Sequence, residues 1–439
     1  MPGSEVKSPK QVDKGAGRMN NLKVYEQRFR DFVGTNPILR GLGLIVAGIW
    51  RRLMFRTTFI VITGSVGKTT AKDAIAQVLG SHFPTYKTTG SFNHYIGITR
   101  NILAVRPWHR YAVIEVGLER PGQMKWFALT TRPDIAVWVN VTRSHTQSFR
   151  TLENNAQEKA LLVGSLRPGG VAVLNCDNPH IAAYCPPKGV HTIRYGTDSS
   201  FDWCASNVSS KWPERLRFFV QGPTGEAVVK TQFVGKHWVP SILPALAIAA
   251  EAGLSLKQAC TALATLEPMV QRISPANTPV GAIFLRDEWN ASIDTLKVAF
   301  EVLQEAEARR KIIVFSGMSD SMQNDATRFR GVGKSAAAIA DLAVFVGDRS
   351  KYAVKGAVYA GMNPEHVRGF YDLESATEFL RSELREGDLV LLRGLLQDHM
   401  SRAYLGMLGE VNCWVATCPK KIACDVCPEL KAINESHGR

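Results

Sequence analysis

The 439-residue sequence has no apolar run long enough to cross a membrane and no secretion signal. A membrane-spanning helix needs about 20 apolar residues, whereas the one uncharged stretch near the N-terminus, Gly41–Trp50, has ten. The residues before it are polar, which excludes a signal peptide. Eight cysteines in a chain of this length do not form the dense disulfide framework of small secreted proteins. We therefore expect a cytoplasmic protein in a reducing environment.

Internal repeats, low-complexity tracts and nucleic-acid-binding motifs are also missing, and acidic residues are few. Lysine and arginine number 53 against 39 aspartates and glutamates, a formal net charge of +14. Residues 1–56 alone carry eleven Lys and Arg against four Asp and Glu, a difference of +7. This asymmetry predicts an acidic partner: a phosphorylated substrate, an anionic membrane or protein, or nucleic acid, for which the sequence has no motif. It also fits a solvated basic arm.

The strongest signal in the sequence is a strand, a phosphate-binding loop and a helix. Phe59–Thr63 is apolar and β-branched, a tight Gly/Ser turn follows, and Ala71–Leu79 has a helical pattern. Backbone N–H groups of such a loop bind nucleotide phosphates, the lysine reaches their outer oxygens, and a threonine hydroxyl binds Mg²⁺. A further glycine, usual in this motif, is replaced by Ile62. We predict ATP or GTP binding by Gly64, Ser65, Val66, Gly67, Lys68, Thr69 and Thr70.

Short β-rich runs alternate with helical segments along the rest of the chain, which predicts an α/β fold with mostly parallel sheets. A strand-rich stretch at 201–233 and alanine-rich helices at 235–264 separate two such α/β units. The strands expected in the first unit are 59–63, 111–116, 135–141 and 170–175, and those in the second are 282–286, 311–316, 342–346, 366–370 and 389–392.

We divide the chain into four regions. Residues 1–57 form a basic arm with a short apolar helix, 58–271 a central ATP-binding domain, 272–412 a smaller Rossmann-like domain, and 413–439 a cysteine-rich tail. The cluster of Pro268, Pro275 and Pro279 lies near the boundary between the two larger domains.

Polar residues recur where predicted strands end. Glu115 ends one strand, His145 follows the next, and Lys159 lies on the helix after that. A carboxylate at a strand end beside a phosphate-binding loop is a common Mg²⁺ ligand. Taken singly, each also fits an ordinary surface side chain.

Eight short motifs follow one another in the chain. They are Thr63–Thr70, Gly90–Gly97, Glu115–Gly117, Asn140–His145, Gln157–Lys159, Gly235–His237, Gln271–Ile273 and Asp287–Ala291. Together and in this order they resemble the Mur ligases, the ATP-dependent amide ligases of peptidoglycan synthesis. They are most similar to the branch that adds D-alanyl-D-alanine to a UDP-N-acetylmuramoyl-tripeptide. The resemblance runs from about Phe59 to Gly409.

The resemblance implies a Mur-ligase-type central P-loop ATPase domain followed by a C-terminal Rossmann-like domain. ATP would phosphorylate a carboxylate on a small-molecule or peptide acceptor, and the amine of an amino acid or dipeptide would attack the acyl phosphate. By analogy, the catalytic residues would be Lys68, His145, Lys159 and Arg272. Mg²⁺ would be held by Thr69, Glu115, His145 and Lys159, the last as a carbamate. Besides the phosphate-binding loop, the nucleotide would contact Asn93, Arg272, Asp287 and Asn290.

The sequence departs from the family pattern in its substrate-binding parts. The family has a folded sugar-nucleotide domain before the loop, where this chain has a short basic segment. Trp238 and Ser241 stand where asparagines are usual, Ser319-Asp320 replaces a leucine and a glutamate, and Arg393-Gly394-Leu395 replaces Lys-Gly-Ser. Two alternatives therefore stay open: a ligase similar to poly-γ-glutamate synthases, and a non-catalytic ATP-binding protein.

The tail contains a C-x₄-C-x₅-C-x₂-C pattern. Four cysteines with this grouping suit tetrahedral Zn²⁺. An iron–sulfur cluster, for which the spacing is not a common one, and free or structural thiols are the alternatives. The expected ligands are Cys413, Cys418, Cys424 and Cys427.

Overall fold

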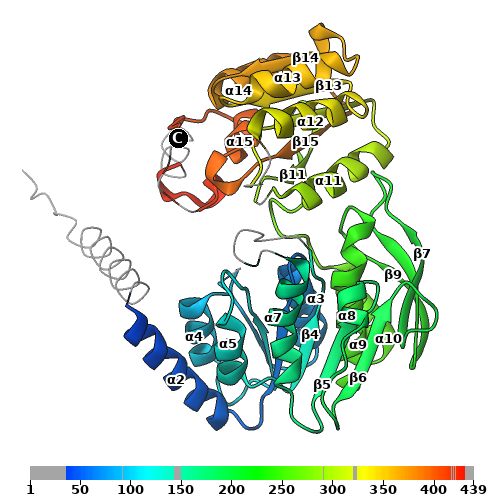
Figure 1. The fold of residues 1–439 in the computed structure, drawn as a ribbon. Coiled ribbons are helices and arrows are strands. Elements are labelled where there is room, and N and C mark those ends of the chain that lie inside the picture. The colour runs from blue at the N-terminus through cyan, green and yellow to red at the C-terminus, as the bar shows by residue number, and fades with distance from the viewer. Residues whose placement is uncertain are drawn as a thin grey trace, which may run out of the picture.

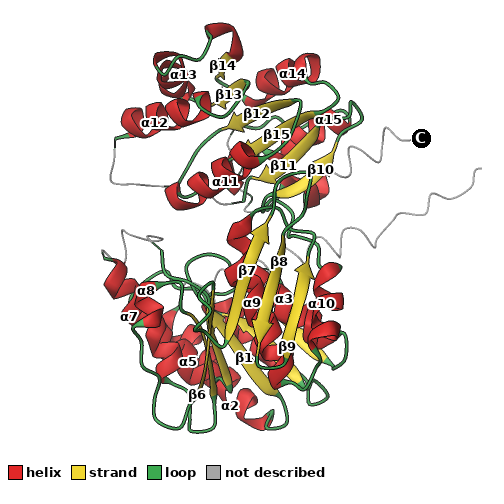
Figure 2. Cartoon of the chain, turned by 90° about the vertical axis from the view of Figure 1, so that its right-hand side faces the viewer, coloured by secondary structure: helices red, strands yellow, loops and turns green. Residues whose placement is uncertain are grey.

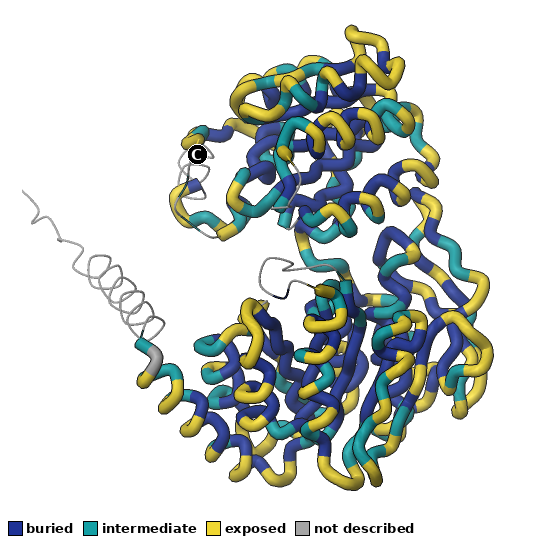
Figure 3. Tube along the Cα trace, in the orientation of Figure 1, coloured by how far each residue is buried: buried dark blue, intermediate teal, exposed yellow. Residues whose placement is uncertain are grey.

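The computed structural model describes residues 36–90, 92–142, 149, 151–289, 291–319, 324–416, 418, 420 and 422–430. Two sheets covered by helices lie one above the other in Figure 1. The lower sheet is built from residues 58–230 and the upper from residues 274–393. Figure 3 shows that the strands are buried and that exposure concentrates on the outer helices and loops. The α/β class predicted from the sequence is confirmed.

The lower sheet has nine strands in the order β2-β3-β1-β4-β5-β6-β7-β8-β9. Pairing is parallel from β2 to β7 and antiparallel among the last three strands, which form the ribbon seen face-on in Figure 2. The strands are β1 Thr58–Thr63, β2 Thr85–Lys87, β3 Tyr111–Glu115, β4 Ile135–Trp138, β5 Val171–Asn175, β6 His191–Gly196, β7 Trp203–Ser209, β8 Arg217–Gly222 and β9 Gly225–Lys230.

Helices cover both faces of this sheet, which explains why its central strands are apolar throughout. Along β1, Ile60 and Ile62 belong to one core cluster, and Phe59 and Val61 belong to the other, because alternate side chains of a strand point to opposite faces. The first cluster packs on α3 Lys68–Gly80, α9 Val239–Glu251 and α10 Leu256–Ala264. The second packs on α2 Pro37–Leu53, α4 Tyr95–Ala104, α5 Gln123–Thr131, α7 Leu152–Gly164 and α8 Pro179–Ala182.

The upper sheet has six strands in the order β10-β11-β15-β12-β13-β14. Only β10 is antiparallel among them. The strands are β10 Ser274–Asn277, β11 Ile283–Asp287, β12 Arg310–Phe315, β13 Leu342–Val346, β14 Val367–Phe370 and β15 Asp388–Arg393. One face packs on α11 Ile293–Glu305, α12 Asp325–Ala337 and α13 Ser350–Tyr359, and the other on α14 Leu373–Glu383 and α15 Ser401–Leu408.

Four single-turn helices complete the described elements. They are η1 Lys236–Trp238, η2 Pro364–His366, η3 Leu396–Asp398 and η4 Cys424–Val426.

All nine strands expected from the sequence are present, and the stretch 201–233, expected to be rich in strands, contains β7, β8 and β9. Three more strands, β2, β6 and β10, were not expected. The strand predicted over 135–141 ends early, at Trp138, and the residues after it form a loop against the phosphate-binding turn. The proposed division at residues 271 and 272 stays a prediction, and the two sheets lie on either side of it.

Helix α2 is longer than the apolar stretch that indicated it. It has 17 residues, starts with Pro37 and is capped by the Asn36 side chain, which accepts hydrogen bonds from the Ile38 and Leu39 N–H groups. None of the helices in the described part of the chain is long and apolar enough to cross a membrane.

Candidate active site

The turn between β1 and α3 is held in one conformation from two sides. Gly67 has φ 81°, a left-handed conformation, and a Cβ atom at this position would lie 2.3 Å from Ser241 Oγ. The N–H groups of Ser65 and Val66 both donate to Asn140 Oδ1 at 2.9 Å. Asn140 lies in the loop after β4, so the neighbouring strand end fixes the backbone that would bind phosphate.

Lys68 curls back over this turn. Its Nζ donates to the carbonyl oxygens of Gly64 at 3.0 Å and Ser65 at 3.1 Å. Burial lowers the pKa of Lys68, and the negative charge of Glu115 opposes that shift. The lysine is therefore a partly buried charge at the position where the outer phosphates of a nucleotide would lie.

Glu115 ends β3 and is 1% exposed. One carboxylate oxygen, Oε1, accepts a hydrogen bond from Asn93 Nδ2 at 2.8 Å. The other, Oε2, is 4.0 Å from Lys72 Nζ and has no hydrogen-bond partner among the described residues. A buried carboxylate oxygen without a donor is costly unless a cation binds it. This atom and the nearby hydroxyl-bearing Thr69, at the start of α3, fit Mg²⁺ bound to a nucleotide.

Lys159 lies on α7 and is 3% exposed. Its Nζ donates to Asn155 Oδ1 one turn earlier and lies 5.6 Å from the centre of the Phe149 ring. Burial, reinforced by the positive charge of Lys68, lowers the pKa of Lys159 to about 7. Much of this amine is therefore neutral at physiological pH, the form that reacts with CO₂ to give a carbamate.

Arg272 is partly buried in the segment that joins the two sheets. Its neighbours Gln271 and Ile273 have φ values of 69° and 49°, and a left-handed conformation is a strained exception for a β-branched residue. Burial lowers the pKa of Arg272, and the charge of Glu115 opposes that shift. The strained linker thus directs a guanidinium from the upper domain towards the site of the lower one.

Asp287, at the end of β11, forms an ion pair with Arg393, at the end of β15. Arg393 Nη2 also donates to Thr295 Oγ1 at 2.6 Å. Burial and the charge of Arg272 lower the pKa of Arg393 to about 9. The sequence analysis predicted Asp287 as a nucleotide contact but did not predict that Arg393 pairs with it. The one sequence feature that pointed to Arg393 was the arginine itself, which stands where the family has a lysine.

The structure brings Lys68, Glu115 and Arg272 within electrostatic reach of one another at the carboxyl edge of the lower sheet. Lys159 lies within reach of Lys68. Asn93 lies beside them, but its amide binds Glu115. Two further predicted site residues, His145 and Asn290, lie outside the described residues. Asn140 and Ser241, which shape the loop, were not predicted as site residues.

Zn²⁺ binding by the tail is not supported. The described residues include all four cysteines, and among them no group of three or more His, Cys, Asp or Glu side chains is placed to hold a metal ion. Instead Cys424 is buried 3.3 Å from His399 Nδ1. The carboxylate of Asp425 binds Arg286 and accepts a hydrogen bond from Gln271 at 3.2 Å. The tail is thus anchored by an ion pair next to the strained linker.

A polar cavity of about 690 Å³ lies beyond the carboxyl ends of four strands of the upper sheet, β12, β13, β14 and β15. Parallel α/β sheets bind ligands at this edge. Its lining includes Ser316, Arg328, Arg349, Asp398, Arg402 and Trp414, so the tail supplies part of the wall.

Comparisons with known proteins agree with this arrangement. Residues 62–249 match the Mur ligase middle domain, and residues 271–395 match the Mur ligase, glutamate ligase domain. The UDP-N-acetylmuramoyl-tripeptide–D-alanyl-D-alanine ligase of Escherichia coli K12 is 29% identical over 304 residues, which cover 69% of this chain and 67% of that protein. The enzyme of the same name from Mycobacterium tuberculosis H37Rv is 30% identical over 356 residues, covering 76% and 70%.

Solved structures show the same fold. MurF from Acinetobacter baumannii superimposes with a TM-score of 0.76 at 23% identity, covering 84% of this chain and 80% of that one. MurF ligase from Thermotoga maritima, in complex with ADP, gives a TM-score of 0.73 at 19% identity, covering 84% and 83%.

Proposed function

We propose that this chain, which belongs to the Mur ligase family and is an ATP-dependent amide ligase, joins a peptide carboxylate of a cell-wall precursor to the amine of a dipeptide. The relatives named above act on UDP-N-acetylmuramoyl-tripeptide and D-alanyl-D-alanine. These two compounds are the first substrates to test, because the motif order and the sequence identity both favour that branch of the family.

One observation carries the catalytic part of the proposal. Two partly buried cations, Lys68 and Arg272, lie within electrostatic reach of the buried carboxylate of Glu115. The buried Lys159 lies within reach of Lys68 at the same sheet edge. Phosphoryl transfer from ATP to a carboxylate gathers negative charge on the transferred group, and fixed positive charges at those oxygens lower the barrier. A cluster of this composition is costly for a protein that only needs to fold.

The proposed reaction is the one that the family resemblance implies. A carboxylate oxygen of the acceptor attacks the γ-phosphorus of ATP, the bond to ADP breaks, and an acyl phosphate forms. The amine then attacks the acyl carbon, loses a proton, and expels phosphate that keeps the former carboxylate oxygen. Lys68 and the turn around it would orient the phosphates, and Arg272 would bind the γ-phosphate.

Glu115 and Thr69 would hold one Mg²⁺, and carbamylated Lys159 with His145 would hold a second. Bound Mg²⁺ neutralises charge on the phosphoryl oxygens. Protonated Lys159 would repel a cation, whereas its carbamate would bind one. The lowered pKa of Lys159 favours the neutral amine from which the carbamate forms, and so supports this role.

We assign the amine substrate to the polar cavity of the upper sheet. A dipeptide brings a free carboxylate as well as its amine. The cavity is lined by three arginines, Arg328, Arg349 and Arg402, and by three aspartates, Asp348, Asp372 and Asp398. Arg328 and Arg349 also pair with Asp325. Guanidinium groups bind carboxylates with paired hydrogen bonds. The basic N-terminal arm, described from residue 36, is proposed as a contact with an acidic surface, and the enzyme as a cytoplasmic one.

The test is mass spectrometry of the products formed from ATP and paired substrates. The acceptors are UDP-N-acetylmuramoyl-tripeptide, the tripeptide without its sugar nucleotide, and glutamate oligomers; the amines are D-alanyl-D-alanine and glutamate. We expect a new amide with a muramoyl-type or free tripeptide acceptor and D-alanyl-D-alanine. Products limited to glutamate chains would favour the poly-γ-glutamate-type alternative. ATP binding without any amide across the panel would contradict the proposal.

A further inference from the structure

The outer face of α2 is apolar and open to solvent. Six of its side chains are each more than half exposed and follow a helical spacing along one side. They are Ile38, Leu42, Ile45, Val46, Ile49 and Leu53. Phe55, directly after the helix, is 83% exposed. An apolar stripe of this length on a folded protein marks an interaction surface.

The inner face fixes the helix on the lower domain. Leu44, Ala47 and Met54 are buried, and Trp50 Nε1 donates to the Val105 carbonyl at 3.0 Å. Arg51 binds the Thr131 carbonyl at 2.9 Å and Asp134 at 2.7 Å, out of reach of the outer face. The helix is therefore apolar on both sides but covered on one, whereas a helix that is apolar all round is normally buried.

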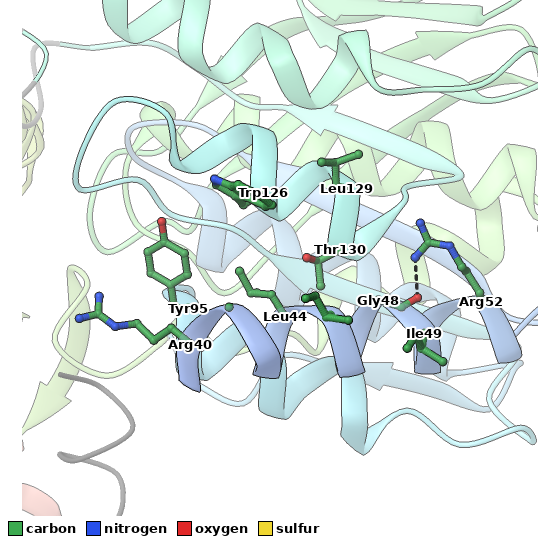
Figure 4. A pocket seen from close by; sticks show the side chains of 11 residues that line it. Arg40, Leu44, Gly48, Ile49, Arg52, Tyr95, Trp126, Leu129 and Thr130 are labelled. Atoms are coloured by element: carbon green, nitrogen blue, oxygen red, sulfur yellow. Dashed lines mark hydrogen bonds between the residues drawn. The ribbon is translucent and has the colours of Figure 1, made fainter. Parts of the chain in front are cut away.

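A pocket of about 620 Å³ opens between α2 and α5 (Figure 4). Its walls are mainly apolar and include Leu44, Ile45, Ile49, Trp126 and Leu129. Gly41 leaves room along the helix, because a Cβ atom there would meet nothing within 4 Å. The volume lies in the range of sites that bind small apolar ligands.

The charged residues around the pocket are basic, which favours an anionic ligand. Arg40 and Arg52 lie at opposite ends of the pocket in Figure 4, and Arg56 is exposed just after the helix. Neither α2 nor α5 contains an aspartate or glutamate. An apolar ligand with an anionic end therefore matches both the walls and the rim of the pocket.

We propose that the pocket takes an acyl chain of an anionic phospholipid, so that α2 lies flat in the surface of an acidic membrane. Trp126, 55% exposed at the pocket, suits the interface between headgroups and chains. No helix in the described part of the chain is long and apolar enough to span a membrane, and α2 combines an apolar outer face with arginines, as interfacial helices do. A second copy of the chain is disfavoured, because a two-fold interface would place the same arginines opposite one another.

Co-sedimentation of the full chain with vesicles tests the surface. Binding is expected to vesicles containing phosphatidylglycerol at low salt, and to weaken in high salt or with phosphatidylcholine alone. Arg52→Gln with Arg56→Gln should weaken it about 25-fold, at about fivefold for each basic residue. Ile45→Glu with Ile49→Glu should weaken it by at least about tenfold. Val228→Glu, at a 55% exposed site on β9, is the matched control and should bind like wild type.

Quenching of Trp126 by brominated acyl chains tests the pocket. The Trp126 signal is defined by difference from Trp126→Phe, and Gly41→Phe, which fills the pocket, should abolish the quenching. Quenching that survives Gly41→Phe would overturn the acyl-chain site. The proposal that α2 binds membranes would be wrong if the wild-type protein stayed in the supernatant. It would also be wrong if the double variant at Ile45 and Ile49 bound vesicles like wild type. A dimer in sedimentation equilibrium that this double variant dissociates would likewise contradict it.

Discussion

Carbamylation of Lys159 is the prediction that the structure quantifies best. A lysine with the usual pKa of about 10.4 is neutral in only about one molecule in 2,500 at pH 7. With the pKa of Lys159 lowered to about 7 by burial and the Lys68 charge, about half of the amine is neutral at that pH. The form that reacts with CO₂ is thus enriched about 1,000-fold over a surface lysine.

The perturbations are Lys159→Ala and a pH series on the wild-type protein. Lys159→Ala should lose most ligase activity, and formate or acetate should restore part of it by supplying the missing oxygen ligand. In ¹³C-bicarbonate, wild type should show one protected carbamate resonance. The resonance should weaken between pH 8 and pH 6, because the neutral fraction falls from about nine tenths to about one tenth.

Lys230→Ala, which removes an exposed lysine at the end of β9, controls for background labelling and should leave the resonance in place. Absence of the resonance from wild type at pH 8, together with activity that is indifferent to bicarbonate depletion and to Lys159→Ala, would refute the reasoning.

Three further predictions concern the same region. Lys68→Ala should fold normally but lose at least about 100-fold in ATP turnover, measured as phosphate release. Turnover within about tenfold of wild type would contradict a role for Lys68 in binding the nucleotide phosphates. Gly67→Ala should weaken nucleotide binding, measured by calorimetry, because the φ angle of Gly67 is 81° and the new Cβ atom would meet Ser241 Oγ. Adding Ser241→Gly to this variant should recover part of the lost affinity. Wild-type affinity in Gly67→Ala alone would refute the prediction. Burial and Arg393 lower the pKa of His237 to about 3. Since an unfolded histidine binds its proton near pH 6.5, the free energy of unfolding should fall from pH 6.5 to pH 3. Denaturant titrations of His237→Gln should show a shallower fall, and an unchanged slope would exclude a contribution from His237.

Local patterns were sufficient to predict the centre of the fold. The strand β1, its glycine turn and α3 are encoded within one continuous stretch, because a short apolar, β-branched run and the turn chemistry after it are local properties. The missed strands lack such patterns. Strand β2 has only three residues, β6 contains the exposed polar residues His191 and Arg194, and β10 contains Pro275. Proline is tolerated in β10 because that strand lies at the edge of its sheet.

Site contacts between distant segments could not be read from the sequence. The bonds from the phosphate-binding turn to Asn140, and the Arg393–Asp287 pair, depend on which strands are neighbours. The cysteine spacing in the tail suggested a metal, but the tail is held by the Asp425–Arg286 ion pair, which no local pattern encodes. The placement of Arg272 depends on left-handed backbone at Gln271 and Ile273, which their side chains do not indicate.

The most direct test of the account is the fate of an acceptor oxygen. The acceptor is synthesised with ¹⁸O in its terminal carboxylate and incubated with ATP, Mg²⁺ and D-alanyl-D-alanine, and the released phosphate is analysed by mass spectrometry. Formation of an acyl phosphate predicts one ¹⁸O atom in each phosphate released, in step with amide formation. Phosphate that carries no ¹⁸O while the amide accumulates would contradict the mechanism, and labelled acceptor that stays unchanged while ATP is hydrolysed would contradict the ligase assignment for this substrate pair.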